Sequence, residues 1–193
     1  MELLFAHMNQ HSRVSRESYD HFKTICSERT YKKDEFLVEE GEQSDNVFLI
    51  LEGVAREYIT TKSGEEKNKS LATKGHVVSS VKSSFYKTKS KIAIQALTDL
   101  SVIQAPFEDI LFMCIMHQDL AHYKYRSLQF SYTELEDRTI DFLCLTAKER
   151  FIKFKERYPF MEFEIDKKHI ASYLGTTVEE LNEIQNSILK TQD

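Results

Sequence analysis

Between residues 30 and 107, short runs rich in Val, Ile, Phe and Tyr alternate with glycines and polar turn residues. The runs are short, and four of the five glycines in the chain punctuate them: Gly41, Gly53, Gly64 and Gly75. Glycine adopts backbone angles that other residues resist, so it suits the turns between strands. Many short strands at this spacing predict an antiparallel sandwich or barrel. The Ser63–Gly64 pair, between two strand-like arms, predicts a hairpin turn.

Helical patterns flank this segment on both sides. Residues 14–29 place Tyr19, Phe22 and Ile25 at helical spacing, with Ser15 at the start. Residues 108–157 are helical again. Strands in one block and helices in others predict an α+β fold.

The stretch from residue 121 to residue 142 contains neither Gly nor Pro. A helix of this length would be about 33 Å long at 1.5 Å per residue. Mostly apolar residues recur along it at alternating steps of four and three: Ala121, Tyr125, Leu128, Tyr132, Leu135, Thr139 and Phe142. Such a repeat forms one stripe, which favours pairing with a second copy of the helix in a homodimer. The alternative is that the stripe packs on the strand domain of its own chain.

Capping residues divide the rest of the chain. Thr146 and Glu149 have the spacing of a capping box, and Pro159 would end that helix. Residues 160–168 alternate between apolar and polar side chains, which predicts a short strand or an extended link.

The segment 169–190 has the spacing of two short helices joined by a tight turn. Asp166 is placed to cap the first helix and Gly175 to end it, and Thr177 is placed to cap the second. The second helix has an apolar inner face at positions i, i+3 and i+7, formed by Leu181, Ile184 and Ile188. This is the layout of a helix-turn-helix, in which the second helix reads DNA.

The charge balance limits which partners the whole chain attracts. Its 26 Lys and Arg against 31 Asp and Glu give a net charge of −5, so any binding to nucleic acid must come from a local patch. The N-terminus does not resemble a signal peptide, and no apolar run is long enough to span a membrane. We therefore expect a cytoplasmic protein without membrane contact.

No catalytic or metal-binding motif is recognisable. The cysteines are far apart in the sequence (Cys26, Cys114 and Cys144), and the seven histidines have no metal-ligand spacing. We therefore expect neither a metal nor an iron–sulfur cluster, and we do not expect an enzyme.

Two stretches, "FLVEEGEQSDNVFLILEGVAREY" and "IASYLGTTVEELNEI", resemble the Crp/Fnr superfamily of transcription regulators. The resemblance implies a cyclic-nucleotide-binding-like β-roll (a double-stranded β-helix) over residues 1–117. It implies a dimerisation helix over residues 118–145 and a helix-turn-helix domain over residues 146–193. It also implies a homodimer that binds DNA.

In members of this family that bind cyclic nucleotides, a short helix, a Glu and an Arg hold the ribose and phosphate. The matching stretch here is residues 75–97, in which the Glu position falls among His76 to Ser79 and the Arg pattern reads Lys89-Ser90-Lys91. Lysine does not form the bidentate fork of arginine, so we do not expect cyclic AMP in the usual mode.

The same region is rich in lysine, with seven Lys and no Asp or Glu from residue 67 to residue 98. The lysines are either solvated residues of strand edges and loops or the site of an unidentified anionic effector. In the second case the candidate residues are Gly75, Lys82, Lys89, Ser90 and Lys91.

The reading helix of the predicted helix-turn-helix is acidic. Glu183 and Gln185 occupy positions where the family carries Arg, and Glu179, Glu180 and Glu183 would repel phosphate. The candidate DNA contacts are Lys168, Thr176, Thr177, Asn182, Gln185 and Asn186. The sequence thus leaves two hypotheses: a DNA-binding regulator, or a dimeric sensor or adaptor of the same fold that acts through a protein partner.

Overall fold

The structure is a computed structural model that describes residues 1–189. Within them the helices are α1 (Glu2–His11), α2 (Arg16–Lys23), α3 (Val81–Tyr86), α4 (Phe107–Met116), α5 (Gln118–Cys144), α6 (Ala147–Arg157), α7 (Met161–Glu164), α8 (Lys167–Leu174) and α9 (Val178–Leu189). The strands are β1 (Ser27–Tyr31), β2 (Phe36–Val38), β3 (Asn46–Glu52), β4 (Ala55–Thr60), β5 (Glu66–Ala72), β6 (Val77–Val78), β7 (Ala93–Ala96) and β8 (Leu100–Pro106). The predicted α+β class is confirmed. The end of the predicted 146–193 segment, residues 190–193, lies outside the described residues, and the predicted domain limits stay predictions.

The strands form an antiparallel β-roll. One sheet has the order β1-β8-β3-β6 and the other has the order β2-β7-β4-β5. Inward-facing side chains from both sheets, among them Phe48, Ile50, Ile94 and Val102, form a buried core. The predicted hairpin turn lies between β4 and β5, where Gly64 has φ +83°.

One glycine of the roll is required for two reasons. Gly53 has φ +89°, which disfavours residues with a side chain. A Cβ atom there would also lie 2.3 Å from the carbonyl oxygen of Asp99. The turn between β3 and β4 therefore depends on glycine for both its backbone angle and its close contact.

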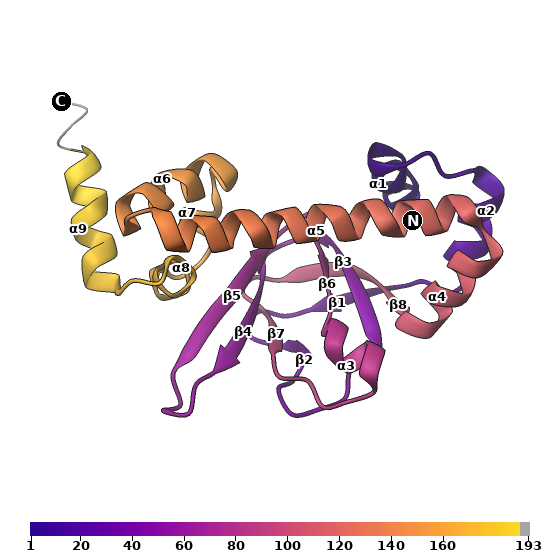
Figure 1. Ribbon diagram of the computed structural model, residues 1–193, viewed down its shortest axis with the longest axis horizontal. Coiled ribbons are helices and arrows are strands. Elements are labelled where there is room, and N and C mark those ends of the chain that lie inside the picture. The colour runs from indigo at the N-terminus through magenta and orange to yellow at the C-terminus, as the bar shows by residue number, and fades with distance from the viewer. Residues whose placement is uncertain (190–193) are drawn as a thin grey trace.

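Helix α5 runs along the roll and joins two groups of helices (Figure 1). At one end α1, α2 and α4 cover the outer face of β3 and β8, where Leu4, Met8, Leu49, Ile103 and Leu120 form a second buried cluster. At the other end lie α6 to α9. Their core is a third cluster, which also includes Val54, Leu71 and Leu97 of the roll.

Two local predictions need correction, and one helix was not predicted. The helix predicted within residues 14–29 is shorter (α2), and α1 precedes it without having been predicted. Residues 160–168 do not form a strand or an extended link, because they contain α7 and the start of α8. Met161 and Ile165 are both buried. The helix buries these two residues four positions apart and leaves Phe163, the third apolar residue of the alternating pattern, exposed.

The predicted caps are largely confirmed. Thr146 and Glu149 form a capping box, and the Ser15 hydroxyl accepts a hydrogen bond from the Ser18 N–H. Asp166 is the N-cap residue of α8, but its side chain makes no capping hydrogen bond. Its main-chain oxygen accepts from the His169 N–H instead.

Candidate effector cleft and helix-turn-helix

A cleft of about 460 Å³ lies between α5 and the β4–β5 side of the roll. Its walls include Glu57 and Lys69 from the strands and Glu134 and Arg138 from α5. The resemblance to cyclic-nucleotide binders makes a space beside residues 75–97 a candidate effector site, and His76 to Ser79 do line this cleft.

Opposite charges in the cleft already pair with one another. The buried Glu57 carboxylate lies 2.6 Å from Lys69 Nζ and accepts a hydrogen bond from the Ser70 hydroxyl at 2.8 Å. Glu134 forms an ion pair with Arg157 and lies 3.7 Å from His76 Nε2. Burial lowers the pKa of His76, which favours the neutral ring. An anion entering the cleft would therefore meet two carboxylates and compete for cations that already have partners.

Buried serines link α3 to the strands around it. The Ser90 hydroxyl lies 2.7 Å from the Ser80 hydroxyl and 2.6 Å from the Ile92 carbonyl oxygen. The Ser83 hydroxyl donates to the Thr88 carbonyl oxygen. Among the described residues no buried side-chain nitrogen or oxygen lacks a partner. The hydroxyls of this segment thus satisfy one another and hold α3 in place.

The predicted effector residues differ in exposure. Lys82, Lys89 and Lys91 are exposed, whereas Ser90 is buried. Gly75 lies beside the imidazole of His7 on α1. The role of these five residues in binding an anion stays a prediction.

Carboxylates from other parts of the chain neutralise some of the lysine-rich segment. Lys87 Nζ lies 3.1 Å from Asp45 and 3.0 Å from Glu108, and Lys67 pairs with Glu65. With Lys69 bound to Glu57, three of the seven lysines have acidic partners. The sequence run is therefore less positive in space than it is along the chain.

Helices α8 and α9 form the helix-turn-helix. Gly175 ends α8 with φ +68°, and a Cβ atom there would lie 2.5 Å from the Phe142 ring. The Thr177 hydroxyl accepts from the Glu180 N–H at 3.2 Å at the start of α9. Leu181 and Ile184 are buried against the third cluster, and Ile188 packs on it partly buried. The predicted inner face of the second helix is confirmed.

The outer face of α9 carries the predicted reading residues. Glu179, Glu180 and Glu183 are exposed. Among the candidate DNA contacts, three are exposed (Lys168, Thr177 and Asn186) and three are half-buried (Thr176, Asn182 and Gln185). Over residues 146–189 there are seven basic and eight acidic side chains.

Lys167 is the cation nearest to the polar residues of α9. Its Nζ donates to Asn182 Oδ1 at 2.8 Å and to Gln185 Oε1 at 2.7 Å. Two neighbouring lysines are already paired with acids, since Lys153 binds Asp141 and Lys155 lies 3.4 Å from Glu162. Lys167 thus joins Asn182 and Gln185 in one polar group, which the spacing of the sequence could not show.

The predicted dimer stripe is only partly covered by its own chain. Tyr125, Leu128, Tyr132, Leu135 and Phe142 are between 40% and 65% exposed. Ala121 is half-buried. Phe142 differs from the others because its ring also contacts Gly175 and lies under the guanidinium groups of Arg138 and Arg150. The roll leaves much of this stripe exposed, although Leu128, Tyr132 and Leu135 line the cleft beside it, and pairing through the stripe stays a prediction.

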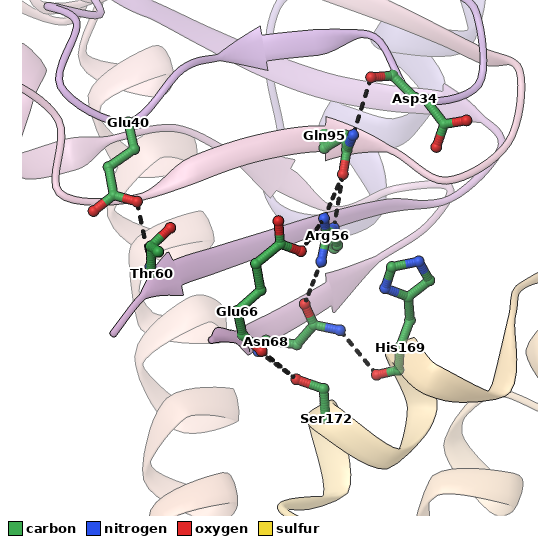
Figure 2. A network of polar contacts seen from close by, with 9 residues as sticks. All are labelled: Asp34, Glu40, Arg56, Thr60, Glu66, Asn68, Gln95, His169 and Ser172. Carbon is green, nitrogen blue, oxygen red and sulfur yellow. Dashed lines mark hydrogen bonds and ion pairs between the residues drawn. The ribbon is translucent and has the colours of Figure 1, made fainter. Parts of the chain in front are cut away.

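A polar network attaches α8 to the edge strand β5 (Figure 2). The Asn68 N–H donates to the Ser172 hydroxyl at 2.9 Å, and that hydroxyl donates to the Glu66 carbonyl oxygen at 3.3 Å. Asn68 Nδ2 donates to the His169 carbonyl oxygen at 2.9 Å. A sheet edge exposes unpaired backbone groups, and here Ser172 partners two of those of β5. Sequence reasoning missed this contact because its two sides are about a hundred positions apart.

The centre of this network is the buried guanidinium of Arg56. It lies 2.6 Å from Glu66, donates to Gln95 Oε1 at 2.9 Å through Nε, and reaches Asn68 Oδ1 at 3.5 Å. Burial, followed by the positive charge of Arg56, lowers the pKa of the nearby His169 to about 4. The imidazole is therefore neutral at neutral pH, and the network holds one buried cation rather than two.

Asn68→Ala is expected to lower the free energy of unfolding by about 2 kcal/mol, because the His169 carbonyl loses its donor and Arg56 loses an acceptor. Urea denaturation at one fixed protein concentration measures the change. Lys67→Ala, an exposed change on the same strand, is the matched control. Equal stability of the two variants would contradict a structural role for the Asn68 side chain.

Comparison with known proteins shows which solved structures have a similar architecture. Residues 28–117 match the family model of the cyclic nucleotide-binding domain. No curated protein matches the chain. Among solved structures, FixK2 from Bradyrhizobium japonicum is similar with a TM-score of 0.75 and 21% identity, over 87% of this chain and 86% of that chain.

Two further structures have the same arrangement. A mutant of CooA from Carboxydothermus hydrogenoformans aligns with a TM-score of 0.69 and 17% identity, over 87% of this chain and 78% of that chain. The c-di-GMP-responsive global regulator CLP of Xanthomonas campestris aligns with a TM-score of 0.70 and 11% identity, over 92% of this chain and 93% of that chain. The chain therefore shares the fold of these solved structures over most of its length, and residues 28–117 match the cyclic nucleotide-binding domain.

Proposed function

We propose that this chain is a transcriptional regulator of the Crp/Fnr type that binds DNA as a homodimer and acts by binding rather than by catalysis. The observation that carries the proposal is the assembled helix-turn-helix, whose second helix has a buried inner face and an exposed outer face. The relatives in fold include proteins named as regulators.

Dimerisation would occur through α5. The helix has 27 residues, about 40 Å at 1.5 Å per residue, and its stripe is exposed along most of that length. Two such helices side by side would bury the stripe tyrosines and leucines of both copies. They would also place two helix-turn-helix units in one dimer. A symmetric reader of this kind binds two half-sites.

The effector of this regulator is not cyclic AMP in the usual mode. Serines 80 and 90 hydrogen-bond to each other within the segment that resembles the nucleotide-binding cassette, and the cleft beside it contains two carboxylates. Arginine or backbone donors free to bind phosphate would be needed to offset the desolvation of an anion. An anionic effector at Gly75, Lys82, Lys89, Ser90 and Lys91 would bind on an exposed face instead.

The acidic surface of α9 favours a second candidate, a dimeric sensor or adaptor that acts through a protein partner. Glu179, Glu180 and Glu183 are exposed on the face that a DNA reader turns to phosphate. Lys167 is already bound to Asn182 and Gln185. Both candidates require the α5 dimer, so only the measurement of DNA binding separates them.

We expect the full chain to retard a random-sequence DNA duplex at low salt and micromolar protein, with weaker binding as salt rises. An electrophoretic mobility shift across a salt series measures this, and a Lys167→Ala, Lys168→Ala variant is the matched comparison. Loss of retardation in the variant would support contact through α8 and α9. A dimer that shows no retardation at any salt concentration would contradict the regulator and favour the adaptor.

A further inference from the structure

A second, apolar pocket lies on the outer face of β3 and β8, next to the polar cleft described above. It has a volume of about 310 Å³ and is bounded by α3, α4 and the first half of α5 as well as by the N-terminal helices. In Figure 1 these helices surround the end of the roll opposite the helix-turn-helix. Ligand pockets in proteins range from about 300 to 1,000 Å³, so this pocket suits a small ligand.

The walls of the pocket are almost entirely apolar. Leu49, Ile103 and Phe107 are buried side chains that face it, and Val81 and Phe85 of α3 are exposed beside them. Protein interiors are close-packed, with few voids larger than a water molecule. This pocket instead opens to solvent beside Val81 and Phe85, so an apolar ligand would cover apolar surface that water otherwise contacts.

Two of the three cysteines also line the pocket. Cys26 and Cys114 are both half-buried there, whereas Cys144 is exposed elsewhere on the chain. Burial raises the pKa of the Cys26 thiol to about 12 and raises that of Cys114 as well. Both groups are thus neutral thiols at neutral pH, and they extend the apolar wall rather than adding charge.

One cation completes the site. Lys124 on α5 is the one Lys or Arg that lines the pocket within residues 1–189, and its ammonium lies 5.1 Å from the centroid of the Phe107 ring. No carboxylate of the described chain lies within ion-pair distance of it, unlike Lys69 or Lys87. The hydroxyls of Ser79 and Ser127 also line the pocket. An apolar ligand in this pocket would therefore meet one positive charge, with two serines also among the lining residues.

We propose that this pocket binds a single-chain aliphatic carboxylate, with the chain among the apolar walls and the carboxylate at Lys124. The apolar walls select the chain, and the ammonium selects an anionic head over a neutral one. The site adjoins the polar cleft, because both spaces are lined by Val77, Ser79, Val81, Ser127 and Leu128, but the rest of its apolar walls and Lys124 are its own. It does not depend on whether the chain binds DNA.

Decanoate and decan-1-ol are the probes for isothermal titration with the full chain, because they share the chain length and differ in the head group. We expect saturable binding of decanoate at one site per chain and weaker binding of decan-1-ol. Lys124→Met should lower the affinity for decanoate by at least about tenfold and leave the affinity for decan-1-ol unchanged, since only the ion pair is lost. Lys62→Met, an exposed lysine that neither lines the pocket nor belongs to the predicted effector residues, is the matched control and should change the binding of neither probe. Equal loss in both variants, or no saturable binding, would overturn the proposal.

Cysteine labelling locates the ligand without depending on a variant that folds. N-ethylmaleimide reacts with accessible thiols, and mass spectrometry gives the rate at each cysteine. Decanoate should slow the labelling of Cys114 and leave the labelling rate of Cys144 unchanged. Ala105→Leu, which adds volume to a pocket wall, should abolish decanoate binding while the melting temperature shows that the chain is folded. Protection that is equal at all three thiols, or absent at Cys114, would mean that the fatty acid does not occupy this pocket.

Discussion

Charging the exposed stripe of α5 is expected to separate the proposed dimer into monomers. Tyr132→Glu with Leu135→Glu would place four carboxylates in one seam, two from each copy. An unpaired charge buried in an apolar contact carries a large desolvation cost, so the association should weaken by at least about 100-fold. Sedimentation velocity over a concentration series measures the shift. Both side chains are more than half exposed in the single chain, at 65% and 51%, so the fold of the monomer should survive.

Thr133→Glu is the matched control, because Thr133 is exposed on the same helix and lies outside the four-three stripe. This variant should remain a dimer. Circular dichroism and the melting temperature show whether each variant is folded. A wild-type chain that stays monomeric at high concentration, or a charged pair that leaves the dimer intact, would contradict pairing through this stripe.

The elements that the sequence predicts correctly are those whose signals are local. The glycines between strands and the Thr146–Glu149 capping box act over a few residues, so the spacing alone shows them. The stripe on α5 is likewise visible in the sequence, because a helix of 27 residues is long enough for the repeat to recur several times. The resemblance of the two quoted stretches then supplied the order of the domains.

The features that the sequence could not show depend on contacts between distant segments. Lys87 looks like part of a positive run until Asp45 and Glu108 are brought to it. Asn68 looks like an ordinary residue in a lysine-rich strand, although it joins β5 to α8. For the same reason the effector prediction, which named Lys82, Lys89, Ser90 and Lys91 together, could not show that Ser90 is buried whereas the three lysines are exposed.

Residues 160–168 show a different limit of prediction from sequence. Their alternating pattern fits a strand, and the two buried residues of the segment, Met161 and Ile165, also fit one turn of helix. Periodicity over so short a segment does not separate the two structures. The neighbouring core determines which structure forms, because Met161 and Ile165 both belong to the buried cluster that contains Phe154.

Reversing two charges on α9 is expected to raise the affinity for random-sequence DNA by about 100-fold at low salt, since each new phosphate contact releases counterions. The variant combines Glu179→Lys with Glu183→Arg, both exposed on the outer face. Glu180 is left in place because it accepts a hydrogen bond from the Thr176 hydroxyl. Fluorescence anisotropy across a salt series measures the gain, and the slope of log K against log salt should steepen by about 2.

Net charge alone also attracts DNA, so the control must carry the same charge change elsewhere. Glu17→Arg with Glu42→Lys does so at exposed positions on α2 and on the roll. Lysine in the first turn of α9 opposes the helix dipole and costs about 0.5 kcal/mol of stability, which a melting curve can detect. If α9 docks in the major groove, the α9 variant gains far more affinity than the control at equal charge. Equal gains would mean that DNA meets the whole surface without using this helix, and the adaptor would then be the better account of the fold.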